Sequence, residues 1–190
     1  MAAAEAPVDD LVARLRAGEP GAFDAAYELH APSTYRFLAR LVGAAVADDL
    51  FQETWLRLAR HGRTLRPDTN LRAWLYAVAR NLARSHARWA GLDAASVAAV
   101  ARWWYLPGPG ASPGASPFEA AVAAAAAARL RSAVDRLPAQ AREILLLVAG
   151  EGLAVEDAAR VLDLTPEAAR QRLHRARAAL ARALPKEDER

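Results

Sequence analysis

The sequence contains no cysteine among its 190 residues, which excludes disulfides, thiolate metal sites and cysteine nucleophiles. Long hydrophobic runs are also missing, because no stretch reaches the roughly 18 uninterrupted apolar residues that cross a bilayer. The opening MAAAEAPVDD lacks the basic segment of a signal peptide. These absences predict a cytoplasmic protein with no direct membrane insertion.

Strand patterns and catalytic signatures are absent as well. No run of alternating β-branched residues marks a strand, and almost every periodic segment has helical spacing, so we predict an all-α fold. No GxSxG, Walker or GxGxxG sequence occurs, and His30, His61, His86 and His174 show neither i,i+4 nor HExxH spacing. We therefore predict no enzymatic activity, no metal site and no cofactor.

Lysine is nearly absent, since Lys186 is the only one and the other basic residues are arginines. The net charge is +3 and the pI is about 9.8, which makes the whole chain only mildly basic. Any nucleic-acid signal must therefore lie in how the charge is distributed. With 54% hydrophobic residues the chain has enough apolar content for packed cores.

The chain divides into two helical blocks. Helices are expected over residues 8–17, 20–30, 32–42, 45–60 and 71–89, with Pro20 and Pro32 at helix starts and Gly18 and Gly43 at helix ends. A flexible Pro/Gly-rich linker is then predicted by the segment YLPGPGASPGASPF, residues 105–118. We expect an N-terminal helical domain over 1–90, a linker over 91–117 and a C-terminal helical domain over 118–190.

The helix LRAWLYAVARNLARSHARW, residues 71–89, has no acidic residue. On a helical wheel its apolar stripe is Leu71, Leu75, Val78, Leu82 and Trp89. Arg80, Arg84 and Arg88 are four residues apart on roughly the opposite side. Like charges at this spacing repel, so the row favours an anionic partner such as a phosphate backbone over a solvated face, although both interpretations stay open.

The second block contains a helix-turn-helix pattern. Pro138 opens its first helix, Gly150 and Gly152 end it, VEDAARVL is the short helix, and Thr165 with Pro166 begins the last. On the last helix a buried stripe is expected at Ala169, Leu173, Ala176 and Leu180. The residues expected to face DNA are Gln171, His174 and Arg175, flanked by Arg170, Arg172 and Arg177. This pattern also occurs in purely structural bundles, but the lack of acids from residue 168 to 184 favours DNA.

A third motif, ADDLFQETWLRL, presents a different charge. Asp48, Asp49, Gln52 and Glu53 fall on one side of a helix, and Leu50, Phe51 and Leu58 fall on another. An acidic face cannot serve the phosphate backbone that the basic helices favour, so it predicts a separate, basic partner. The alternative is a solvated helix whose acids suit its N-terminus.

Four motifs in order resemble bacterial sigma factors of the extracytoplasmic-function group. They are DDLFQETWLRL, LRAWLYAVARNLARSHAR, RLPAQAREILLLVAGEGLAVEDAARVL and RQRLHRARAAL. Each motif is degenerate, but four in this order with a linker in the middle are specific. The resemblance covers roughly residues 20–90 and 128–184.

The resemblance implies three contact sets in a promoter-specificity subunit of RNA polymerase. Core polymerase binding falls on Asp48, Asp49, Gln52, Glu53 and Leu56. Contact with the single-stranded −10 element falls on Asn70, Trp74, Arg80, Asn81, Arg84 and Arg88. Contact with the duplex −35 element falls on Arg170, Gln171, Arg172, His174, Arg175 and Arg177.

Two segments depart from the family pattern. Ala154 stands where the short helix commonly has a Ser or Thr cap, which forgoes about 0.5 to 2 kcal/mol of capping. Glu167, Ala168 and Ala169 stand where the recognition helix commonly has Gly-Thr-Val. These changes affect the −35 sequence preference more than DNA binding itself.

Other interpretations remain. The runner-up is a helix-turn-helix regulator that acts without polymerase, and a third is a sigma-like decoy that binds a regulator protein. The resemblance also implies an anti-sigma protein, often membrane-tethered, as a partner. Trp103, Trp104 and Tyr105 are expected either to dock on a neighbouring domain or to form an exposed patch. One hypothesis is that the blocks pack together in the free state, with both tryptophans at the joint, and hide both DNA-binding faces.

Overall fold

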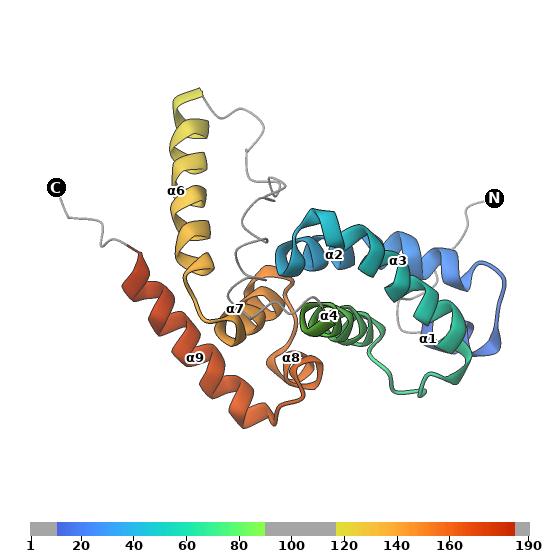
Figure 1. The fold of residues 1–190 in the computed structure, drawn as a ribbon. Coiled ribbons are helices and arrows are strands. Elements are labelled where there is room, and N and C mark those ends of the chain that lie inside the picture. The colour runs from blue at the N-terminus through green and yellow to red at the C-terminus, as the bar shows by residue number, and fades with distance from the viewer. Residues whose placement is uncertain (1–10, 90–116, 185–190) are drawn as a thin grey trace.

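The computed structural model describes residues 11–89 and 117–184 (Figure 1). Within these two ranges the chain consists of helices joined by turns and short loops, as predicted. The helices are α1 (Leu11–Ala17), α2 (Ala22–Val42), α3 (Ala44–His61), α4 (Leu71–Trp89), α6 (Pro117–Asp135), α7 (Ala139–Leu145), α8 (Val155–Leu162) and α9 (Pro166–Ala183). A 3-10 turn at Gly62–Thr64 follows α3, and a π-helical turn at Leu146–Gly150 extends α7. The predicted linker lies outside the described residues except for Pro117, and so do Trp103, Trp104 and Tyr105.

The helices predicted over 20–30 and 32–42 are in fact one helix, α2, with Pro32 in its interior. A proline inside a helix has no N–H to donate and crowds the carbonyl four residues earlier, which costs about 3 kcal/mol. Pro32 itself is exposed, while Ala31 and Thr34 on either side are buried. Packing of this continuous face against α3 and α4 therefore outweighs the local cost.

Helices α1 to α4 form the first block. The contacts among α2, α3 and α4 bury Leu38, Leu58 and Leu75 completely, and each such side chain contributes about 1.5 to 3 kcal/mol. The rings of Phe37 on α2 and Tyr76 on α4 pack with their centroids 5.0 Å apart. This packing fixes the directions in which α3 and α4 present their polar faces.

Helices α6 to α9 form the second block, and α7, α8 and α9 have the predicted helix-turn-helix arrangement. The short helix covers the predicted VEDAARVL, and Ala154 before it makes no side-chain cap hydrogen bond. Asp163 ends α8 in the left-handed conformation with φ of 55°, which aspartate tolerates better than most residues. Thr165 caps α9 by accepting a hydrogen bond from the backbone nitrogen of Ala168 at 3.2 Å.

Arg142 of α7 joins α6 to the rest of the second block. Its guanidinium is buried and donates to the backbone carbonyls of Val134, Asp135 and Leu137 at 3.4, 2.6 and 3.1 Å. These carbonyls lie at the C-terminal end of α6, where a helix has no intrahelical donors left. Burial lowers the pKa of Arg142, an effect that Asp135 opposes.

The two blocks share one hydrophobic core. Helix α8 packs against α4 (Figure 1), and a single cluster contains Leu82 and Ala83 of α4 together with Val161 and Leu162 of α8. This packing agrees with the hypothesis that the blocks associate in the free chain. It also covers a second side of α4, which changes the surroundings of its arginines.

Candidate polymerase and nucleic-acid interfaces

Helix α3 presents the acidic face that the sequence predicts. Asp48, Asp49 and Gln52 are exposed, and the opposite side of α3 is anchored in the core by Leu50 and Leu58. Because the buried side fixes the rotation of the helix, these polar groups are held at the surface on a rigid element.

Two further residues shape the acidic face of α3. Leu56 is 49% exposed, which makes it an apolar contact point among polar neighbours. Glu53 is half-buried and accepts a hydrogen bond from Arg57 at 3.1 Å, one turn further along the helix. The nearby Asp48 carboxylate raises the pKa of Tyr35 on α2. Asp48, Asp49 and Gln52 are all exposed.

The N-terminus of α4 is capped by Asn70. Its Oδ1 accepts from the backbone nitrogen of Ala73 at 3.0 Å, and its Nδ2 donates to Asp157 of α8 at 3.0 Å. Trp74, one turn into the helix, is half-buried against the apolar cluster that includes Trp55. Asn70 therefore combines a structural role at the helix start with a contact to the second block.

Three of the α4 residues predicted to contact single-stranded DNA face outward. Asn81, Arg84 and Arg88 are exposed, and Arg84 makes no ion pair among the described residues, whereas Arg88 donates to Ser85 at 3.0 Å. A basic face of this kind is available to a phosphate backbone.

Arg80 is not on that face, contrary to the helical-wheel prediction. It is only 5% exposed. Its Nε lies 3.0 Å from Oε2 of Glu143, its Nη1 donates to the carbonyl of Val161 at 3.2 Å, and the same atom lies 3.5 Å from Asp163. The prediction placed Arg80 opposite the core because it treated α4 as packed on one side, and the second block covers the other side.

The helical-wheel prediction is also wrong for Trp89. The sequence placed it on the buried stripe with Leu71, Leu75 and Leu82, which are buried, but Trp89 is 89% exposed. Trp89 is the last residue of α4, beyond the length of helix that the rest of the first block covers.

A polar cluster around Glu151 joins the blocks, and its carboxylate is almost completely buried, with a side-chain exposure of 2%. Arg40 lies 3.1 Å from one carboxylate oxygen, while the Tyr76 hydroxyl at 3.1 Å and Arg36 at 4.0 Å approach the other. Arg72 donates to the backbone carbonyl of Glu151. Burial raises the pKa of Glu151, and the Tyr76 hydrogen bond and the three arginines oppose this rise.

Sequence reasoning missed this cluster. Arg40 and Glu151 are 111 residues apart, and Tyr76 and Glu151 are 75 apart, so no local spacing connects them. The one hint in the sequence is that the acidic residue Glu151 lies between Gly150 and Gly152. A charged residue in a glycine-containing turn can indicate a specific polar contact.

Helix α9 displays the predicted recognition face. Gln171, His174 and Arg175 are exposed, and the stripe of Ala169, Leu173 and Ala176 is buried, with Leu180 half-buried. Among the flanking arginines Arg170 and Arg177 are exposed and Arg172 is half-buried. The hypothesis that the packed blocks hide both DNA-binding faces is therefore wrong for α9, because Gln171, His174 and Arg175 stay exposed.

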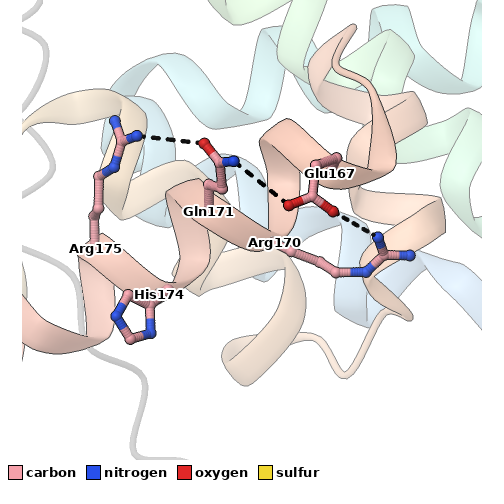
Figure 2. Close-up of a pocket in the computed structure, with 5 residues that line it drawn as sticks. All are labelled: Glu167, Arg170, Gln171, His174 and Arg175. Atoms are coloured by element: carbon pink, nitrogen blue, oxygen red, sulfur yellow. Dashed lines mark hydrogen bonds and ion pairs between the residues drawn. The ribbon is translucent and has the colours of Figure 1, made fainter.

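Glu167 organises the start of this face (Figure 2). Its carboxylate accepts from Arg170 at 3.2 Å and from Gln171 at 3.4 Å, and Gln171 in turn accepts from Arg175 at 3.4 Å. With His174 these residues line an open surface hollow. Arg170 also lies 3.1 Å from Glu156 of α8, whose pKa is lowered by a hydrogen bond to its own backbone and by Arg170. The polar groups that face outward on α9 are therefore arranged by an acid near its N-terminus.

The described residues contain neither a candidate metal site nor a candidate membrane span. In residues 11–89 and 117–184 no three His, Cys, Asp or Glu side chains group as metal ligands. No helix in the same ranges combines the length and hydropathy that a membrane span requires.

The helical fold, the helix-turn-helix and the outward basic faces define a DNA-binding protein with a separate acidic surface. Residues 26–91 match the family Sigma-70 region 2, and residues 127–180 match the family Sigma-70, region 4. The ECF RNA polymerase sigma factor EcfG of Rhodopseudomonas palustris is 34% identical over 150 residues, which cover 78% of this chain and 77% of EcfG. The chain belongs to the extracytoplasmic-function group of the sigma-70 family and directs transcription initiation. Proteins of this family are not enzymes.

Two solved structures have a similar fold. CnrH in complex with the cytosolic domain of CnrY aligns with a TM-score of 0.64 and 23% identity, covering 92% of this chain and 94% of CnrH. The sigma factor RpoE in complex with the anti-sigma factor NepR from Bartonella quintana aligns with a TM-score of 0.64 and 24% identity, covering 89% and 99%. Both alignments span the two blocks.

Proposed function

We propose that the chain docks on core RNA polymerase through the acidic face of α3 and contacts promoter DNA through α4 and α9. The observation that carries this proposal is the separation of charge. Asp49, Gln52 and the exposed Leu56 lie on α3 of the first block, whereas the basic recognition face belongs to α9 of the second block (Figure 1). One surface is therefore free to hold a basic protein while the other holds DNA.

The first DNA contact is with the single-stranded −10 element. The outer face of α4 provides cations and an amide through the exposed residues Asn81, Arg84 and Arg88. Single-stranded DNA binds to basic surfaces through its phosphates and to aromatic rings through base stacking. Half-buried Trp74 is the aromatic platform in this assignment. Asn70 and Arg80 join this −10 contact set when the second block moves away from α4.

The second DNA contact is with the duplex −35 element. Helix α9 has the geometry of a recognition helix whose N-terminal residues enter the major groove. Arg170, Gln171 and His174 are exposed near its start, and Arg175 and Arg177 follow further along. Half-buried Arg172 belongs to the same set. Arginine pairs with guanine and glutamine with adenine at base edges, so this set can discriminate sequences.

The proposed setting is the cytoplasm, with an anti-sigma protein as a regulatory partner. The support is the likeness to RpoE, which was solved with the anti-sigma factor NepR, and to CnrH, which was solved with the cytosolic domain of CnrY. A membrane-tethered anti-sigma protein would hold the chain at the membrane without inserting it.

The docking assignment is tested by the double variant Asp49→Ala, Gln52→Ala. We expect its affinity for core polymerase to fall about tenfold, because two exposed contacts near the centre of the interface are lost. Binding of duplex DNA by α9 remains unchanged. The matched control is Glu28→Ala, an exposed acid on α2. Polymerase affinity equal to the wild type in a pull-down titration would remove α3 from the interface and favour a regulator that acts without polymerase.

A further inference from the structure

Three side chains on the exposed face of α9 form a chain of hydrogen bonds (Figure 2). Nε2 of Gln171 donates to Oε1 of Glu167 at 3.4 Å, and Nη2 of Arg175 donates to Oε1 of Gln171 at 3.4 Å. The three residues are four apart in the sequence, so they lie above one another on one side of the helix. Gln171 is therefore held between an acid towards the start of α9 and a cation towards its end.

The chemistry of these two neighbours sets the direction of the Gln171 amide. An ionised carboxylate only accepts hydrogen bonds, a guanidinium only donates them, and the two ends of an amide have nearly the same shape. If the amide were turned over, its oxygen would face Glu167 and its NH₂ group would face Arg175, and both hydrogen bonds would be lost. Glu167 and Arg175 therefore hold Nε2 towards the start of α9 and Oε1 towards its end.

Glu167 lies on a face assigned to DNA, and Arg170 offsets its charge there. Nη1 of Arg170 lies 3.2 Å from Oε2 of Glu167, and Nη2 lies 3.1 Å from Oε1 of Glu156 on α8. The contact with Gln171 uses the other oxygen of Glu167. Because an opposite charge lies so close, the carboxylate repels phosphates less than an unpaired acid would. Glu167 can therefore orient Gln171 at a small cost to DNA binding.

Gln171 keeps one donor and one acceptor for a ligand. Its nitrogen carries two N–H groups and its oxygen two lone pairs, and the chain of hydrogen bonds uses one of each. A donor beside an acceptor matches N7 and the N6 amino group of adenine in the major groove, and no other base presents that pair on its edge. Gln171 is exposed and lines the open surface hollow on α9, so this amide is accessible from outside.

We infer that Glu167 is a positioning residue that fixes the direction of the Gln171 amide, so that α9 selects adenine over thymine at one position of its duplex. An A·T and a T·A pair present the same groups to the major groove in opposite order. A glutamine held in one direction matches one order, whereas a freely turning glutamine matches both. This role rests on the proposed −35 contact of α9, whose residue set does not include Glu167.

A pool of double-stranded oligonucleotides with a randomised centre provides the test on the full chain. Sequencing of the bound duplexes gives the base preference at each position. Gln171→Ala identifies the position that Gln171 reads, because the preference there is lost. Glu167→Gln keeps the shape of the side chain but both donates and accepts, so Gln171 can turn over. The matched control Glu156→Gln removes the carboxylate on the other side of Arg170.

We expect the wild type to select adenine over thymine about tenfold at the Gln171 position, and Glu167→Gln to do so less than about threefold. Glu156→Gln should keep the wild-type ratio. An adenine preference that survives Glu167→Gln, an equal loss in Glu156→Gln, or selection of another base at this position would overturn the inference alone. A wild-type chain that selects no sequence from the pool would overturn the −35 assignment and the inference together.

A second readout locates the contact on the base. In a selected duplex 7-deazaadenine replaces the adenine, which keeps the pair with thymine and removes the N7 acceptor. We expect the affinity of the wild type, measured by fluorescence anisotropy, to fall about threefold to tenfold, because the N–H of Gln171 loses its partner. Gln171→Ala should bind both duplexes equally. Equal affinity of the wild type for the two duplexes would overturn the inference.

Discussion

The arginines of this protein serve two physically different purposes, and burial separates them. Arg142 and Arg80 are buried and satisfied by carbonyls or carboxylates. Arg84 and Arg175 are exposed on helix faces. The planar guanidinium suits both settings because it binds several acceptors and keeps its charge when buried. The sequence alone does not separate the two sets, since helical spacing is similar for all of them.

His30 makes the stability of the first block depend on pH. Burial, with a smaller effect from Arg72, lowers the pKa of His30 below its ordinary value of 6.5. The unfolded chain therefore binds a proton more readily than the native one, and stability is lost as the pH falls through 6.5. We expect the melting temperature of the wild type to drop more than that of His30→Gln between about pH 7.5 and about pH 5.5.

The control for this measurement is His61→Gln, because His61 is exposed on the same block. That variant leaves the His30 contribution in place, so its melting temperature changes with pH as in the wild type. If His30→Gln shows the wild-type pH dependence as well, the neutral buried histidine is not the cause.

Arg175 is the residue on α9 with the sharpest expected effect on DNA. Replacing it with alanine should weaken duplex −35 binding by about 1 to 3 kcal/mol if it pairs with a base, and by less if it touches only phosphate. Arg129→Ala is the matched control, since it removes one exposed charge from α6. Fluorescence anisotropy at physiological salt measures both variants, and equal affinities would refute a specific role for Arg175.

At the level of the helices, the sequence predictions are reliable where local capping residues set a helix boundary. The start of α9 follows from Thr165 and Pro166, whose capping geometry acts within one turn. Pro32 gives the opposite result, because long-range packing of α2 overrides a local break signal. The buried state of Arg80 could not be predicted either, since its partner Glu143 is 63 residues away.

The junction of α6 and α7 depends on one side chain. Replacing Arg142 with methionine fills similar space but leaves three carbonyls without their buried donor. We expect the free energy of unfolding to fall by about 2 to 4 kcal/mol, measured by urea denaturation of the full chain. Arg136→Met is the control, because Arg136 is exposed and donates to Ser132 alone among the residues that the structure describes. Its effect should stay within about 0.5 kcal/mol. Equal effects of the two variants would contradict the capping role.

In the whole molecule, acidic and basic side chains gather on different helix faces. The acidic face belongs to α3 of the first block and the recognition face to α9 of the second block (Figure 1), and the proposed −10 face of α4 is partly covered where the two blocks meet. Helical periodicity was sufficient to predict the all-helical fold, and the four motifs in sequence order were sufficient to predict the family. They could not predict the packing between the blocks, because that packing depends on contacts between residues far apart in the chain.

Run-off transcription tests whether the chain docks on core polymerase through α3 and directs initiation at specific promoters. Core bacterial RNA polymerase is incubated with a pool of promoter fragments from the source genome, with and without the full chain. We expect specific transcripts only when the wild-type chain is present, and we expect them to be lost with the double variant Asp49→Ala, Gln52→Ala. Duplex binding by α9 without any specific transcript would contradict this expectation.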